Sequence, residues 1–159
     1  MEATKATLLK ALAPLDNATL NLKPDADTWS ILQIVMHVTK SEAGTLQYIK
    51  KKTQDPAALA MAGLVPWFRI AALIAGVRSP VKFKAPKGLA DVPETGDFQT
   101  ASLAWAEVRE DWREYIEAFP EALSDRLIFR HPFVGMLGPR LCTSFAGGKC
   151  VHFMLLQRV

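Results

Sequence analysis

Apolar residues recur at helical spacing along much of the chain, and this pattern predicts a series of amphipathic helices. The first predicted helix covers residues 3–13, where Leu8, Leu9 and Leu12 share one face. Pro14 ends this helix or opens a short second one. The following residues are rich in Pro, Asp and Asn, so they predict a loop.

A longer helix is predicted from Ile31 to about Lys52. Ser30 is a favourable N-cap, and Gln33 stands three residues later, which completes a capping box. The lysines at 50–52 suit the negative end of the helix dipole. The predicted buried stripe of this helix consists of Ile34, Val38, Leu46 and Ile49.

The next segment, residues 57–76, is almost wholly apolar. Asp55 and Pro56 are suited to start a helix, and Pro66 is expected to kink or split it. A membrane-spanning helix needs about 20 apolar residues, so the length is just sufficient. Arg69 near the middle, Pro66 and the many small residues argue against spanning. We therefore expect a buried or partner-facing pair of helices and no membrane association.

A strongly amphipathic helix is predicted from Asp97, its N-cap, to Pro120. It follows a loop over residues 79–96 and precedes a connection with short turns. Its charged positions are predicted to face solvent, namely Arg109, Glu110, Arg113 and Glu114. Its predicted buried stripe consists of Phe98, Ala101, Leu103, Trp105, Val108, Trp112, Tyr115, Ile116 and Phe119. Thr143 or Ser144 is expected to cap a last helix.

The four main helical segments, without convincing alternation of period two, predict an all-α four-helix bundle. A chain of 159 residues is the size of one domain, so we expect residues 1–159 to form a single bundle domain.

Composition and charge narrow the class of protein. Only two cysteines, Cys142 and Cys150, are present, so a disulfide framework is not expected. The first residues contain Glu2 and no long apolar run, so we expect a cytoplasmic protein without a signal peptide. All 16 acidic residues lie at or before Asp125, and the basic residues beyond it lack the interleaved aromatic residues of a nucleic-acid module. We expect no nucleic-acid partner.

The three histidines are the strongest candidates for chemistry. His37 lies close to the apolar stripe of its helix, where a lone histidine is more often a satisfied core residue than a ligand. His152 lies in the last predicted helix, and histidines from two helices of a bundle can face one interior point. His131 precedes Pro132, which favours an extended loop conformation and a structural hydrogen bond.

Two motifs give the chain a resemblance to a known family. The segment "DTWSILQIVMHVTKSE" resembles the W-S…H-x-x-x-x-E segment of the DinB/YfiT-like superfamily, and "RHPFVGMLG" resembles its HP-x-x-G segment. Order and spacing agree from about Leu8 to Leu137, and the stretch after Leu137 fits poorly. The resemblance implies a four-helix bundle with up-down-down-up topology. It also implies a divalent metal such as nickel or zinc, held by one histidine of the second helix and two of the last.

On that resemblance the metal ligands of this chain are His37 and His152. The remaining histidine of the family falls on Gly148, which has no donor atom, so the site is incomplete. Three explanations stay open. The site has decayed; a water, Glu42 or Cys150 replaces the ligand; or a reading-frame or sequencing change has altered the last helix. Two adjacent glycines, each costing about 1 kcal/mol in a helix, make this last helix unusual.

The activity implied is that of a divalent-metal-dependent hydrolase or thiol S-transferase with a degenerate metal site. Its partners are a low-molecular-weight thiol, such as bacillithiol or mycothiol, and a small electrophile. Bound metal lowers the pKa of a thiol and holds the thiolate ready to attack. No general base stands out, although Glu42 is a candidate. The alternative is a non-catalytic helical bundle that acts through binding or dimerisation, and a homodimer is expected in either case.

Overall fold

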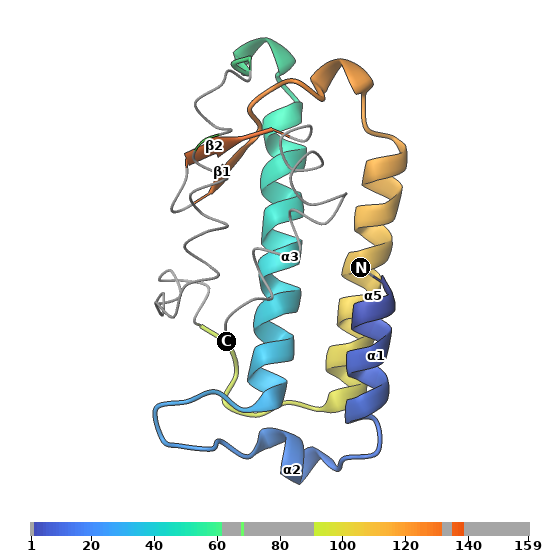
Figure 1. The fold of residues 1–159 in the computed structure, drawn as a ribbon, viewed down its shortest axis with the longest axis vertical. Coiled ribbons are helices and arrows are strands. Elements are labelled where there is room, and N and C mark those ends of the chain that lie inside the picture. The colour runs from blue at the N-terminus through green and yellow to red at the C-terminus, as the bar shows by residue number, and fades with distance from the viewer. Residues whose placement is uncertain (1, 62–67, 69–90, 132–134, 139–159) are drawn as a thin grey trace. The chain divides into compact units, whose positions relative to one another are not determined.

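The computed structural model describes residues 2–61, 68, 91–131 and 135–138 (Figure 1). This part of the chain is predominantly helical, as the sequence predicts. Its α-helices are α1 (Glu2–Leu12), α2 (Asn17–Asn21), α3 (Ile31–Thr53) and α5 (Phe98–Glu117). Its shorter elements are the 3-10 helices η1 (Pro56–Ala58) and η2 (Glu121–Leu123) and the strands β1 (Phe129–His131) and β2 (Gly135–Leu137).

The capping box predicted at the start of α3 is confirmed. The Ser30 N–H donates to Gln33 Oε1 at 3.1 Å, and the Gln33 N–H donates to Ser30 Oγ at 3.2 Å. Ser30 is fully buried, so both groups need these hydrogen bonds in place of water. The predicted stripe holds at three of its four positions: Val38, Leu46 and Ile49 are buried, whereas Ile34 is only partly buried.

Helix α5 also begins where the sequence predicts. Asp97 Oδ1 accepts hydrogen bonds from the Thr100 N–H and the Thr100 hydroxyl, both at 2.8 Å. These bonds hold the pKa of the exposed Asp97 carboxyl below its ordinary value, with the Thr100 N–H as the largest cause. Asp16 caps α2 in the same way through the Thr19 N–H, which likewise lowers the Asp16 pKa.

The buried face of α5 differs from the prediction at several positions. Ala101 and Trp105 are buried as expected, but Leu103 and Ile116 are more than half exposed. Arg109, predicted to face solvent, is buried. The prediction for Arg109 was wrong because a buried acidic partner, described below, lies far away in the sequence.

The helix predicted from Ala57 does not form over its first residues. Pro56 opens only the single turn of η1, after which Leu59 is buried in an extended conformation. The Ala60 carbonyl accepts the Leu127 N–H at 2.8 Å, and Met61 pairs with Arg126 as an isolated antiparallel bridge. The backbone here is therefore paired between segments instead of along a helix. Of the rest of the predicted helix pair only Phe68 is described, and Pro66 and Arg69 lie outside the described residues.

A small β-hairpin stands where the sequence predicts only turns. Strands β1 and β2 are antiparallel, with Phe129 opposite Leu137 and His131 opposite Gly135. Just beyond β2, Gly138 lies against the chain at Arg126, where an added Cβ would meet the Arg126 carbonyl oxygen at 2.3 Å. Only glycine fits this close approach. Strands of three residues are too short to show alternation in the sequence.

The chain divides into two compact units. The first comprises Met1–Ala43 with Ala85–Glu114, and the second comprises Gly44–Lys84 with Tyr115–Val159. Among the described residues, the core of the first unit contains Leu12, Leu20, Leu32, Val35, Val38, Ala101 and Trp105. The core of the second contains Leu46, Ile49, Leu59, Leu123 and Ile128. The single-domain organisation over residues 1–159 stays a prediction, and so does the up-down-down-up order, because the predicted last helix lies outside the described residues.

Candidate functional site

His37 lies in the second turn of α3 and is largely buried, with 9% of its surface exposed. Its imidazole is in contact with the indole of Trp29, with ring centroids 4.8 Å apart and planes tilted by 54°. The sequence prediction that His37 lies close to the buried stripe of its helix is therefore consistent with its position. The contact with Trp29 was not foreseen.

The approach of Trp29 to His37 follows from the way α3 begins. Trp29 directly precedes the N-cap Ser30, so its side chain is placed beside the first turns of the helix. Side chains of a helix lean toward its N-terminus, which brings the imidazole of His37 back toward Trp29. The motif that starts the helix therefore also supplies one wall of the histidine's surroundings.

A second polar cluster joins α3 to α5 within the first unit. Glu42 is 3% exposed and accepts a hydrogen bond from Trp105 Nε1 at 3.0 Å. Arg109 Nη2 donates to Glu42 Oε1 at 2.8 Å, and Arg109 Nε lies 2.8 Å from Oε2. Trp112 Nε1 donates to the Glu42 backbone carbonyl at 3.2 Å. Two indoles and one guanidinium therefore meet a single buried glutamate.

Cations also lie over the indole ring of Trp105. Lys5 Nζ from α1 lies 5.7 Å from the ring centroid, and the Arg109 guanidinium carbon lies 5.9 Å from it. Lys5 is itself 9% exposed, so its apolar stem contributes to the packing around the ring. The cluster therefore links α1, α3 and α5.

These contacts bear on the roles considered for Glu42. A carboxylate that replaces a missing metal ligand, or that acts as a general base, needs an oxygen directed at the metal or substrate. Both oxygens of Glu42 already face donors from α5. The arrangement gives Glu42 a structural role, as an acceptor that fixes α5 against α3.

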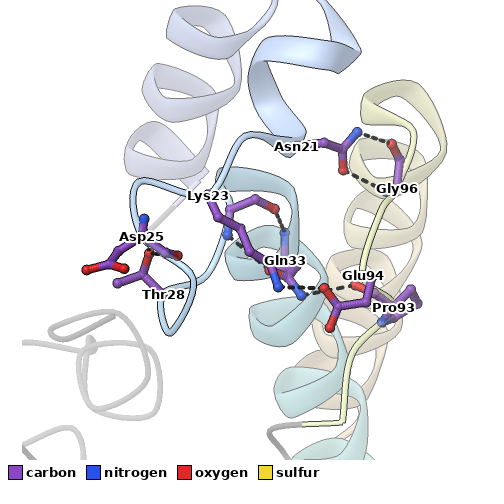
Figure 2. Close-up of polar contacts among 9 residues, drawn as sticks. Asn21, Lys23, Asp25, Thr28, Gln33, Pro93, Glu94 and Gly96 are labelled. Carbon is purple, nitrogen blue, oxygen red and sulfur yellow. Dashed lines mark hydrogen bonds and ion pairs between the residues drawn. The ribbon is translucent and has the colours of Figure 1, made fainter.

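The segment before α5 is fastened to α2 and to the start of α3 by polar contacts (Figure 2). Asn21 Nδ2 donates to the Gly96 carbonyl and Asn21 Oδ1 accepts the Gly96 N–H, both at 2.9 Å. Lys23 forms an ion pair with Glu94. Gln33 Nε2 donates to the Pro93 carbonyl at 3.4 Å, while its Oε1 serves the capping box. These contacts place the N-terminus of α5 beside the first turn of α3.

A shallow apolar groove also lies between α3 and α5 in the first unit, and neither His37 nor Glu42 lines it. Its walls are Met36, Thr39, Lys40, Ala43, Ala101 and Ala104. The groove offers no donor set for a metal.

A metal ion requires several convergent donors. The residues that the structure describes contain no group of three His, Cys, Asp or Glu side chains able to hold one. His37 offers one imidazole donor, and its burial against the Trp29 ring agrees equally with a ligand and with a core histidine. His152, Gly148 and Cys150 lie outside the described residues, so the rest of the predicted set is not placed. For His131, the backbone lies in β1 and pairs with Gly135.

The comparisons identify the family. The model of the DinB superfamily matches residues 1–154, so the chain belongs to the DinB superfamily. The match extends beyond Leu137, where the sequence motifs suggested a poor fit, and includes the positions of Gly148 and His152. The comparison with curated proteins gives no match, and neither does the comparison with solved structures. Among the described helices, none combines the length and the apolar character that crossing a membrane requires.

Proposed function

We propose that this DinB-superfamily protein is a divalent-metal-dependent enzyme of the thiol S-transferase or hydrolase type, with a reduced metal site. His37 and His152 are its protein ligands for nickel or zinc. The observation that carries the proposal is the burial of the His37 imidazole on α3, against the ring of Trp29. A surface histidine would not be held in this way.

The residues of the chain have different roles in such a site. His37 supplies a nitrogen donor from a helix whose start is fixed by the capping box. Glu42 and Arg109 hold α5 against that helix and are occupied by one another. A bound divalent metal would lower the pKa of a low-molecular-weight thiol and polarise a small electrophile. With Gly148 in place of a histidine, solvent or substrate would supply the donors that the chain lacks.

The alternative is a non-catalytic bundle that acts through binding, as a homodimer. Gly148 supports it, because two imidazoles form a weak site. The contacts of Glu42 support it too, because both of its carboxylate oxygens already meet donors from α5. Both proposals place a homodimer in solution, so oligomeric state does not separate them.

Activity with added metal separates the two proposals. The protein, purified without a histidine tag and treated with chelator, is assayed for conjugation of a low-molecular-weight thiol to an electrophile. We expect turnover to appear on addition of nickel or zinc and to disappear in His37→Gln. Glutamine has similar size but lacks the imidazole donor.

Glu110→Gln is the matched control, because Glu110 is an exposed residue of α5 paired only with its neighbour Arg113 in the described structure. This variant should keep the wild-type rate. Turnover that is independent of metal, or equal in His37→Gln and wild type, would contradict the proposal. Stable dimers without any metal-dependent turnover would favour the binding protein.

A further inference from the structure

We propose that Trp29 is a positioning residue for His37, and that its indole ring restricts the place and the plane of the imidazole. The proposal deepens the proposed function and rests on it, because the orientation matters most when His37 binds a metal. The observation is the ring contact of 4.8 Å between Trp29 and His37.

The geometry of the contact limits the motion of the imidazole. The two ring planes are tilted by 54°, so part of the imidazole lies against the apolar indole. Rotation about the χ1 angle of His37 would carry the imidazole away from this contact, and a flat aromatic ring favours particular mutual orientations. An aliphatic side chain of similar bulk would fill the space without imposing a direction.

The Trp29 ring can only act in this way if its own backbone is fixed. The adjacent Ser30 is fully buried and bonded in both directions with Gln33 in the capping box. Gln33 also reaches the Pro93 carbonyl, so the segment before α5 braces the same turn (Figure 2). The backbone beside Trp29 is therefore held by side chains from α3 and by the chain at Pro93.

This arrangement explains a feature of the sequence that helix formation alone does not require. An N-cap serine works after almost any residue, but a tryptophan in front of it places a ring along the helix toward His37. Hydrogen-bonded groups that orient a metal ligand contribute about 10–100-fold to metal affinity, and we place an orienting ring contact at the lower end of that range. We therefore expect Trp29 to affect the chemistry of His37 more than it affects folding.

The first test measures the imidazole directly and needs no metal. Diethylpyrocarbonate acylates accessible histidine nitrogens, and peptide mapping gives the rate at His37 separately from the other histidines. We expect Trp29→Leu to raise that rate about three- to tenfold, the equilibrium factor that one aromatic pair contributes. Trp29→Phe, which keeps a ring, should stay closer to the wild type than to Trp29→Leu.

Tyr48→Leu is the matched control. Tyr48 also lies on α3 and contacts an aromatic ring, that of Phe129, with centroids 5.9 Å apart. It should leave the His37 rate unchanged. Circular dichroism and urea unfolding establish that each variant compared is folded. Equal rates of His37 acylation in wild type, Trp29→Leu and Trp29→Phe would overturn the proposal. Equal acceleration in Trp29→Leu and Trp29→Phe would overturn it too, because the effect would then depend on the size of the side chain and not on its ring.

The second test is the affinity for nickel or zinc in the same variants. We expect Trp29→Leu to bind metal about tenfold more weakly than wild type, and Trp29→Phe to recover most of the affinity. If the wild-type protein binds no metal, the proposed function fails and the acylation rates still decide the role of Trp29. If wild type binds metal and Trp29→Leu binds it equally well, the proposed function stands and the positioning role is overturned.

Discussion

At the scale of single residues, the Arg109–Glu42 pair shows what a periodic pattern leaves out. A charged residue on an amphipathic helix is ordinarily placed in solvent, as was predicted for Arg109. Yet one helix face has the i, i+3, i+4, i+7 spacing, and Arg109 lies on it together with Trp105, Val108 and Trp112. That spacing was the available signal for its burial. Its partner Glu42 could not be found from periodicity, because it stands 67 positions away.

Removing Arg109 alone should be costly. Arg109→Leu leaves the Glu42 carboxylate buried beside Trp105 without its guanidinium partner. Breaking one side of a buried ion pair lowers the free energy of unfolding by about 3–5 kcal/mol. The double variant Glu42→Leu with Arg109→Leu should recover much of this loss, because no uncompensated charge remains. Urea unfolding followed by circular dichroism measures all three proteins.

The exposed pair of Arg113 and Glu110 on the same helix provides the control. Both side chains are about half exposed, so Arg113→Leu should change the free energy of unfolding by about 0–1 kcal/mol. A loss for Arg109→Leu no greater than that for Arg113→Leu would show that the buried pair is not structurally important.

At the scale of elements, the helix starts were the most predictable feature. Ser30, Gln33 and Asp97 act through hydrogen bonds within three residues, so the local sequence contains both partners. The hairpin was missed because its pairing joins strands too short to show a period. The failure of the helix at Leu59–Met61 has the same origin, since the competing partners are Arg126 and Leu127.

The cap at Asp97 predicts a particular dependence on pH. The folded state holds the pKa of this carboxyl below its ordinary value through the Thr100 N–H. The carboxylate therefore adds stability above about pH 4, and this contribution is lost as the pH falls through the lowered folded pKa. Asp97→Asn can still cap the helix but cannot titrate. The difference between the urea unfolding midpoints of wild type and Asp97→Asn should therefore become smaller as the pH is lowered.

Asp55 provides the comparison, because its side chain makes no cap hydrogen bond to η1. The midpoint difference between wild type and Asp55→Asn should change less over the same pH range. A constant difference between wild type and Asp97→Asn from about pH 5 to 2 would contradict the assigned role of this cap.

Two glycines predict opposite effects of the same substitution. Gly138→Ala places a Cβ 2.3 Å from the Arg126 carbonyl oxygen, so it should lower the free energy of unfolding by about 1–3 kcal/mol. Gly44→Ala lies inside α3 with no atom within 4 Å of the new Cβ, so it should raise that free energy by about 0.5–1 kcal/mol. Thermal and urea unfolding test both. A gain in stability for Gly138→Ala would refute the close approach.

At the scale of the whole molecule, the family was the most secure inference from sequence. The paired motifs indicated it, and the match over residues 1–154 confirms it. The candidate site was predictable only in part. His37 could be chosen from its motif and its place beside an apolar stripe; its burial agrees with that place, and its role as a metal ligand stays a prediction. The contacts of Glu42 depend on how α3 and α5 meet in space, which no pattern along the chain encodes.

The central claim is that His37 is a metal ligand, and metal content tests it most directly. The protein is purified without a histidine tag, equilibrated with nickel or zinc, freed of excess ion and measured by elemental analysis beside His37→Ala. The account predicts close to one metal per chain in wild type and a loss of that metal in the variant. Equal metal in both proteins, or none in wild type after equilibration, would contradict it and would leave His37 as a core residue of α3.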